Sequence, residues 1–258
     1  IDPFHLEAYG VTTVNYNRDV EIFPVLSAIF EEIMGECPYK SPTDMGVNMA
    51  GNCIIDDEAC KEASRQEIIR RYYNCLCDLK RGNSTPAVLY KLELLMKQAG
   101  ITVADRKVIA AAMNREEATG APAAAIELPD GTLVTGKTSD LLGASAACLL
   151  NALKILAGID HEIHLVSPDA IHPIQTLKIN YLGSQNPRLH TDEILIALSI
   201  SAATSPDAAR ALNAVPLLKG CEVHSSVMLA QVDTGIFKKL GMHLTCEPKN
   251  EEKDVKKQ

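Results

Sequence analysis

The chain has 258 residues, of which 47% are hydrophobic and 22% are charged, and its formal net charge is −8. This length allows about two domains, no apolar run is long enough to span a membrane, and the negative charge argues against broad binding to nucleic acid. We therefore expect a cytoplasmic globular protein with small-molecule or protein partners, without a membrane or nucleic-acid partner.

The start of the chain indicates that a part is missing. It begins at Ile1 without an initiator methionine, and its first residues are neither a signal peptide nor a typical polar start. We expect the C-terminal part of a longer protein, whose missing N-terminal domain is one partner. The eight cysteines are scattered over a chain that can build its own core, which favours reduced, buried thiols over a disulfide framework.

The first part of the chain has apolar residues at helical spacing. The first helix is predicted over residues 22–33, with Pro24 either opening or kinking it. A longer helix starts at Asp56 or Asp57 and reaches Arg81. Its acidic start and basic end complement the helix dipole.

Two further helices complete the first part of the chain. Thr85 and Pro86 have the pattern of an N-cap followed by a first helical residue, and Gly100 ends that helix. Thr102 opens a fourth helix, which ends near Gly120. We therefore expect residues 1–120 to form a mainly helical domain.

Between the first two helices lies a long polar loop, residues 38–57, without a helical or strand period. Irregular segments beyond about 12–15 residues are usually functional or disordered, and the apolar residues spaced along this one favour an anchored loop. Binding sites are common on such loops.

The polar residues of this loop, with a cluster just before the first helix, form the first candidate site. Cations beside amides and hydroxyls suit a phosphate or carboxylate, and a carboxylate can act as a general base. We predict Lys40 and Asp44 as catalytic residues. The predicted substrate-binding residues are Asn15, Asn17, Arg18, Ser41, Thr43 and Asn48. The alternative is a loop whose side chains bond to its own backbone.

After Gly120 the pattern changes to alternating strands and helices. Residues 123–128 and 132–135, joined by the turn at 129–131, predict a β-hairpin. Alternation of this kind predicts a three-layer α/β sandwich over residues 121–248, with a mixed sheet because the hairpin is antiparallel. Further helices are predicted at 140–158, 170–182, 191–203, 206–214 and 233–240, and strands at 162–166, 221–229 and 242–246. Residues 249–258 form a charged tail that we expect to be disordered.

One segment has the letters of a nucleotide-binding phosphate loop. Residues 131–138 match G-x-x-x-x-G-K-[S/T], but β-forming residues after a hairpin turn do not suit a compact phosphate cradle. A weaker prediction is an anion site just before the next helix, with Lys137 and Thr138. The alternative is a capped helix with a solvated lysine.

A second possible anion site lies in the loop before residue 191. Arg188 stands near His190 there and could bind an anionic group. The alternative is that Thr191 or Asp192 simply caps the next helix. No His and Cys spacing in the chain predicts a metal, and the cofactor is unknown.

Five segments resemble a bacterial family known as uncharacterised protein family 0371, or domain of unknown function 1846. They are Asn15–Leu26, Ser41–Gly51, Gln66–Tyr73, Asp130–Gly143 and Asn186–Glu193, so the resemblance covers nearly the whole chain. It implies a larger protein whose N-terminal half, absent here, resembles a nucleotide-binding α/β domain with a glycine-rich phosphate loop. The hairpin-helix unit and the final strand-helix-strand also resemble cytidine-deaminase-like domains, without their zinc-binding P-C-x-x-C motif.

These observations predict the C-terminal part of a cytoplasmic bacterial protein. One hypothesis is an enzyme that acts on a small anionic or phosphorylated metabolite together with the missing half. The alternative is a non-catalytic oligomerisation or regulatory module, with the helical part as the interface of a homo-oligomer. Apolar helical surfaces left exposed would favour the module, and convergent polar side chains would favour the enzyme.

Overall fold

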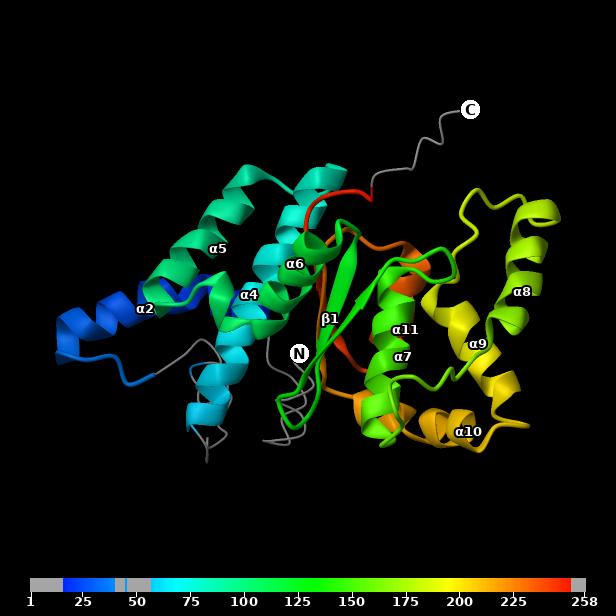
Figure 1. Ribbon diagram of the computed structural model, residues 1–258. Coiled ribbons are helices and arrows are strands. Elements are labelled where there is room, and N and C mark those ends of the chain that lie inside the picture. Colours follow the sequence, from blue (N-terminus) through cyan, green and yellow to red (C-terminus); the bar gives the residue numbers. More distant parts are fainter. Residues whose placement is uncertain (1–15, 40–44, 46–56, 252–258) are drawn as a thin grey trace. The chain divides into compact units, whose positions relative to one another are not determined.

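The computed structural model describes residues 16–39, 45 and 57–251 (Figure 1). The chain divides into two compact units, Ile1–Arg106 and Lys107–Gln258, which are described separately below. Within the described residues, no helix combines the length and the apolar character needed to cross a membrane.

The first unit is helical in its described part. It contains α2 (Tyr16–Met34), α4 (Asp57–Arg81), α5 (Pro86–Ala99) and the short 3-10 helix η1 (Val103–Asp105). Pro24 lies inside α2 rather than at its start. Thr85 is the N-cap of α5, and Gly100 follows this helix with a left-handed φ of 63°, so both predicted ends are confirmed.

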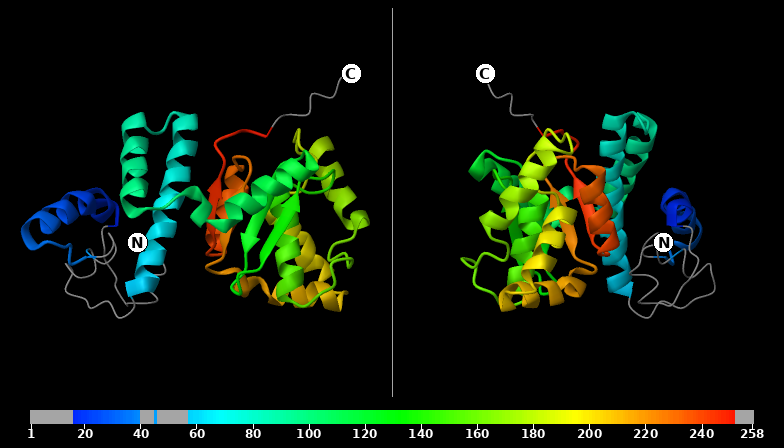
Figure 2. Two further views of the ribbon diagram at one scale, coloured as in Figure 1. Left: turned by 60° about the vertical axis from the view of Figure 1, so that its left-hand side comes forward. Right: turned by 90° about the vertical axis from the view of Figure 1, so that its right-hand side faces the viewer.

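The core of this unit is formed by α4 and α5, which Figure 2 shows side by side. Their apolar faces bury Ile68, Ile69 and Tyr73 from α4, and Leu92 and Leu95 from α5. Ile69 and Tyr73 are four residues apart, and Leu92 and Leu95 are three apart, which is the spacing that places side chains on one face of a helix.

The helix predicted from Thr102 to Gly120 is wrong in its first turn. The Asp105 carboxylate accepts a hydrogen bond from the Thr102 backbone N–H at 2.6 Å, and this capping contact closes the short helix η1. Arg106 then takes an extended conformation, and α6 starts at Lys107 and ends at Thr119. Side-chain caps compete with continued helix in this way.

A four-stranded sheet organises the second unit. Its strands are β1 (Ala123–Glu127), β2 (Leu133–Lys137), β3 (Glu222–Ser225) and β4 (His243–Cys246), in the order β2-β1-β3-β4. Strand β1 is antiparallel to β2 and β3, whereas β3 and β4 are parallel. The predicted mixed sheet is confirmed, and β2 and β3 point their carboxyl ends in the same direction.

The hairpin explains why the phosphate-loop letters have another meaning. Gly131 has a φ of 83° in the turn, where the Asp130 carboxylate accepts the Thr132 backbone N–H at 2.9 Å. The following residues form β2 instead of a cradle for phosphate. A Cβ at Gly136 would lie 2.2 Å from the backbone nitrogen of Cys148, so this glycine serves close packing.

Helices cover both faces of the sheet, and α6 and α7 (Ala144–Leu156) lie on opposite sides of β1 in Figure 1. Ala125 of β1 packs with Val108 and Ala112 of α6. Its neighbours Ala124 and Ile126 belong to the larger core that includes α7. Successive strand residues point to opposite faces, which is why nearly the whole of β1 is buried.

The remaining helices complete the large core. They are α8 (Pro168–Asn180), α9 (Thr191–Ser201), α10 (Pro206–Asn213), the 3-10 helix η2 (Val215–Leu218) and α11 (Gln231–Lys239). Ser167 and Ser205 cap α8 and α10 by accepting backbone N–H groups of Ala170 and Ala208. The Ser-Pro pattern thus marks helix starts, as its chemistry requires.

The strand predicted at 162–166 is wrong, the helix predicted from residue 140 starts later, and the strand predicted at 221–229 ends at Ser225. Residues 162–166 contain turn and bend residues instead of a strand. A turn occupies the start of this segment, where the Asp160 carboxylate accepts the Glu162 backbone N–H and the Asp160 carbonyl accepts the Ile163 N–H. The helix predicted from residue 140 begins at Ala144, since the Ser139 hydroxyl instead accepts the N–H groups of Leu141 and Leu142.

Candidate functional site

The candidate site lies where two loops pair before their helices. The Gly143 backbone N–H donates to the Leu189 carbonyl at 3.2 Å, and the Leu189 N–H donates to the Leu141 carbonyl at 2.9 Å. A parallel bridge between Leu142 and Leu189 accompanies these bonds. The start of α7 is therefore fixed beside the start of α9.

A cavity of about 180 Å³ opens at this junction. The starts of three helices line it: Gly143 to Ala146 at α7, His190 at α9, and Ala230 at α11. The other lining residues are Thr138, Asn186, Arg188, Leu189, Val227, Met228, Leu229, Asp233 and Glu251. Each helix start carries roughly half a positive charge, and the carboxylates of Asp233 and Glu251 lie in the same lining.

The start of α9 is already satisfied by carboxylates. Asp233 of α11 accepts the Thr191 backbone N–H and the Thr191 hydroxyl through one carboxylate oxygen, both at 2.8 Å. Glu193 accepts the His190 backbone N–H at 2.8 Å. His190 occupies the N-cap position and Thr191 is the first helical residue, so the predicted cap at Thr191 or Asp192 is displaced by one residue or more.

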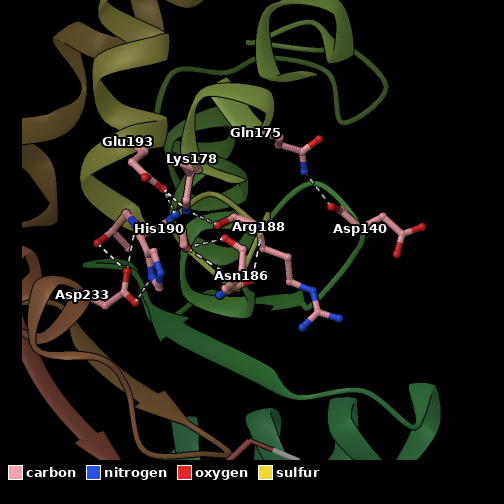
Figure 3. Close-up of polar contacts among 10 residues, drawn as sticks. Asp140, Gln175, Lys178, Asn186, Arg188, His190, Glu193 and Asp233 are labelled. Carbon is pink, nitrogen blue, oxygen red and sulfur yellow. Dashed lines mark hydrogen bonds and ion pairs between the residues drawn. The ribbon is translucent and has the colours of Figure 1, made fainter. Parts of the chain in front are cut away.

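His190 and Asp233 form a hydrogen-bonded pair on the cavity wall. The two side chains face each other in Figure 3, with Nδ1 2.8 Å from the second carboxylate oxygen. The hydrogen bond to Asp233 raises the pKa of His190 above its ordinary value, although partial burial opposes the rise. Burial raises the pKa of Asp233, but the hydrogen bonds from His190 and Thr191 outweigh it and leave that pKa below its ordinary value.

The start of α7, in contrast, is open. Its N-cap Gly143 has no side chain to cap it, and the first helical bond runs from the Ala147 N–H to the Gly143 carbonyl. The preceding N–H groups thus have no partner inside the helix. Ser145 is 3% exposed, and its Oγ has no hydrogen-bond partner within the described part of the chain. A buried hydroxyl without a partner at a helix start suits an anion.

A buried lysine supports the loop that carries His190. Lys178 of α8 donates to Glu193 at 2.7 Å and to the Arg188 carbonyl at 2.6 Å, as Figure 3 shows. The Arg188 guanidinium extends away from the His190–Asp233 pair in the same view. It donates to the Ser139 carbonyl and pairs with Glu251, both at 3.0 Å.

The predicted site residues have different positions in the structure. Thr138 and Arg188 line the cavity, whereas Lys137 is exposed at the end of β2 and does not line it. Asn17 and Arg18 lie in the first turn of α2. The other predicted residues lie outside the described residues: Asn15, Lys40, Ser41, Thr43, Asp44 and Asn48.

Sequence reasoning did not select Ser145 and Asp233. No local motif marks Ser145, which sits among alanines in α7. Asp233 is 43 residues from its partner His190 in the sequence. No local spacing motif predicts a pair so far apart. The only local signal was an acidic first turn at α11 and at α9.

Two family models match the chain. The model "Domain of unknown function DUF1846, N-terminal" matches residues 1–100, and "Domain of unknown function DUF1846, C-terminal" matches residues 104–255. A UPF0371 protein of Corynebacterium urealyticum is 58% identical over 96% of the chain, and one of Corynebacterium glutamicum is 58% identical over 98%. A UPF0371 protein of Streptococcus thermophilus is 56% identical over 96%. The chain spans 50%, 51% and 50% of these relatives.

Proposed function

For this chain, which belongs to the DUF1846 family of domains of unknown function, we propose a function based on the cavity. It is part of an enzyme that acts on a small phosphorylated metabolite, and the start of α7 holds the phosphate. The observation that carries this proposal is the open α7 start with the unpartnered Ser145 hydroxyl in the cavity. Backbone N–H groups and the helix dipole together favour a bound anion.

The neighbouring helix start gives the strongest internal comparison. At α9, Asp233 and Glu193 supply carboxylate oxygens to the backbone N–H groups of Thr191 and His190. At α7, in the same cavity, no protein carboxylate does this within the described residues. A ligand phosphate would give α7 what the protein itself gives α9.

The size of the cavity limits what fits. Small-molecule sites usually enclose about 300–1,000 Å³, whereas this one measures about 180 Å³. A phosphate group with a few attached atoms fills it, and the rest of the metabolite extends outwards. The chain spans about half the length of its relatives, and the rest of the longer protein is the proposed source of further contacts.

We also propose a cytidine-deaminase-like order of elements and a cytoplasmic location. The hairpin followed by α7 and the closing β3-α11-β4 unit support a cytidine-deaminase-like order of elements. A cytoplasmic location suits a phosphorylated metabolite. Neither adds a residue to the site.

A thermal-shift experiment on the chain tests the phosphate site, with inorganic phosphate as the probe and sodium chloride at matched ionic strength as the reference. Ser145→Asp places a carboxylate at the helix start, where negative charge is stabilising, and occupies the cavity. Ser167→Asp is the matched control, because aspartate caps α8 as serine does. Phosphate should raise the melting temperature of wild type and Ser167→Asp, but not of Ser145→Asp. An equal rise in all three proteins would refute the site.

A non-catalytic oligomerisation module is the second candidate function. Apolar side chains on the helices of the first unit favour it: Val25, Ile33 and Met34 of α2 and Tyr90 of α5 are 60%, 75%, 60% and 61% exposed. Ile33→Glu should convert a dimer to a monomer in light scattering if α2 is the interface. An unchanged mass would remove this candidate.

A further inference from the structure

The unused edge of His190 is the feature that extends the proposed site. Its Nδ1 lies 2.8 Å from the Asp233 carboxylate, which fixes the tautomer with the Nδ1 proton directed to Asp233. Nε2 has no hydrogen-bond partner within the described residues, and His190 lines the cavity. Nε2 is therefore the atom of this ring that a ligand can reach.

Hydrogen bonds from Thr191 fix the position of the Asp233 carboxylate independently of the His190 ring. Its other oxygen takes two hydrogen bonds from Thr191, and its side chain is 8% exposed. Burial raises the pKa of this carboxylate, but the hydrogen bonds from His190 and Thr191 outweigh it, and the Thr191 bonds hold the carboxylate in place. It therefore orients the ring and supplies the counter-charge of an imidazolium, as a carboxylate does in other His-carboxylate pairs.

The charged groups around His190 come from every element that packs on it. Asp233 of α11 and Glu193 of α9 favour the protonated ring, and Lys178 of α8 opposes it. Farther along the cavity wall, Arg188 is neutralised by Glu251, and α7 contributes hydroxyl and backbone N–H groups without charge. His190 is thus the group on this wall whose charge can change when a ligand enters.

We propose that the site recognises a phosphate monoester in its dianionic form and takes up a proton at Nε2 of His190 when it binds. This inference rests on the proposed function. The imidazole accepts a proton from solvent and becomes an imidazolium, which donates its Nε2–H to a phosphate oxygen, and no other bond forms or breaks. Such a charge-assisted hydrogen bond is stronger than a neutral one.

The donor set selects phosphate over carboxylate. The N–H groups and the Ser145 hydroxyl at the start of α7 meet the His190 ring at the start of α9, and Thr138 is also part of the lining. Three phosphate oxygens can use this number of donors, whereas a carboxylate has only two oxygens. The second pKa of a phosphate monoester is about 6, close to the ordinary histidine pKa, so ligand and ring compete for one proton near neutral pH.

Calorimetric titration tests the proton uptake. Inorganic phosphate, methyl phosphate and acetate are titrated into wild type at pH 7.5, in two buffers with different ionisation enthalpies. His190→Asn is the test variant, because asparagine is a good N-cap and keeps an N–H for Asp233. His161→Asn is the matched control, since that side chain is 81% exposed and outside the cavity.

The expected result is proton uptake with both phosphates in wild type and in His161→Asn, and none in His190→Asn. The variant should also bind methyl phosphate about tenfold more weakly or worse, since it loses one charge-assisted hydrogen bond. Acetate should bind much more weakly than either phosphate. NMR titration of the His190 ring should show its pKa rising further when phosphate is bound.

Two results separate the possible failures. Phosphate binding that Ser145→Asp abolishes, with the same proton uptake in His190→Asn as in wild type, overturns this inference and leaves the phosphate site intact. No phosphate binding to wild type overturns the phosphate site and the inference together. Acetate binding as tight as methyl phosphate overturns the substrate class.

Discussion

At the scale of single residues, the Asp233 carboxylate connects two of the helices that line the site. Its carboxylate accepts three hydrogen bonds at 2.8 Å, two from Thr191 and one from His190. The residue belongs to α11, while its partners begin α9. One buried carboxylate thereby joins the starts of two helices.

Replacing Asp233 with asparagine should therefore destabilise the second unit. The asparagine amide lacks the negative charge. Its NH2 group would also face the N–H or O–H donors of Thr191 or His190, where the carboxylate accepts hydrogen bonds. Breaking a buried charge pair typically costs about 3–5 kcal/mol, so we expect a loss near the lower end, measured by urea unfolding. The control is Asp207→Asn, whose exposed pair with Arg210 should contribute less than about 0.5 kcal/mol. Equal, small effects would contradict this role.

The His190 pair also makes stability depend on pH. The hydrogen bond to Asp233 is the main reason that the His190 pKa is raised in the folded state. A raised pKa means that the folded state holds the proton more tightly, so the added stability is fully present below the ordinary pKa of 6.5. It is lost as the pH rises through the folded pKa.

Urea unfolding of wild type and His190→Asn across this range checks the sign. The free energy of unfolding of wild type should exceed that of the variant most at about pH 5.5, because the ordinary histidine pKa lies higher. This difference should shrink towards pH 8.5. The His161→Asn protein should follow wild type throughout. A difference in unfolding free energy that grows as the pH rises would contradict the pairing of His190 with Asp233.

At the scale of elements, the contact between β2 and α7 positions the open helix start. Cys148 donates its thiol to the Val134 carbonyl at 3.4 Å, and the Asn151 amide donates to the Thr135 carbonyl at 2.9 Å. These bonds to strand carbonyls come from one face of α7. They are possible because Gly136 lets the helix backbone approach the strand.

Gly136→Ala tests that approach. The added Cβ would lie 2.2 Å from the backbone nitrogen and 2.6 Å from the Cα of Cys148, so the helix must move. Overpacking usually costs about 1–3 kcal/mol, and phosphate binding should weaken as well because the start of α7 shifts. Gly235→Ala in α11 meets nothing within 4 Å and should instead add up to about 1 kcal/mol. Calorimetric unfolding with phosphate titration separates the two, and similar effects would contradict the packing role.

Elements with local signals were predictable from sequence. The start and stop of α5, the hairpin at residues 129–131 and the Ser-Pro caps of α8 and α10 all follow from nearby residue types. The strand predicted at 162–166 was wrong, and the start of this segment lies in a turn closed by hydrogen bonds to Asp160. Its apolar letters carry no information about those bonds.

The candidate site was predictable only in part, for the same reason. Arg188 and Thr138 were selected by their residue types and reach the cavity. Their neighbours Ser145 and Asp233 depend on the pairing of residues 141–143 with Leu189 and on the position of α11. The three helix starts meet because of the topology of the fold. No local residue pattern in the sequence predicts that meeting.

At the scale of the whole molecule, each compact unit has its own buried core. Ile69 of α4 and Leu153 of α7 are each 0% exposed, and they belong to the first and second units respectively. Units with separate cores often unfold separately. The separate matches to the N-terminal and C-terminal DUF1846 models fall close to the same division.

Ile69→Ala and Leu153→Ala should therefore lower different unfolding transitions. Truncating a buried Leu or Ile costs about 2–5 kcal/mol, since it removes apolar contacts and leaves a cavity. Scanning calorimetry should resolve two transitions in wild type. Phosphate should raise only the transition that Leu153→Ala lowers, because the proposed site lies in that unit and a ligand stabilises the unit that binds it. A single transition that both substitutions lower equally would mean that the two cores unfold as one, and the phosphate effect would then report on the whole chain.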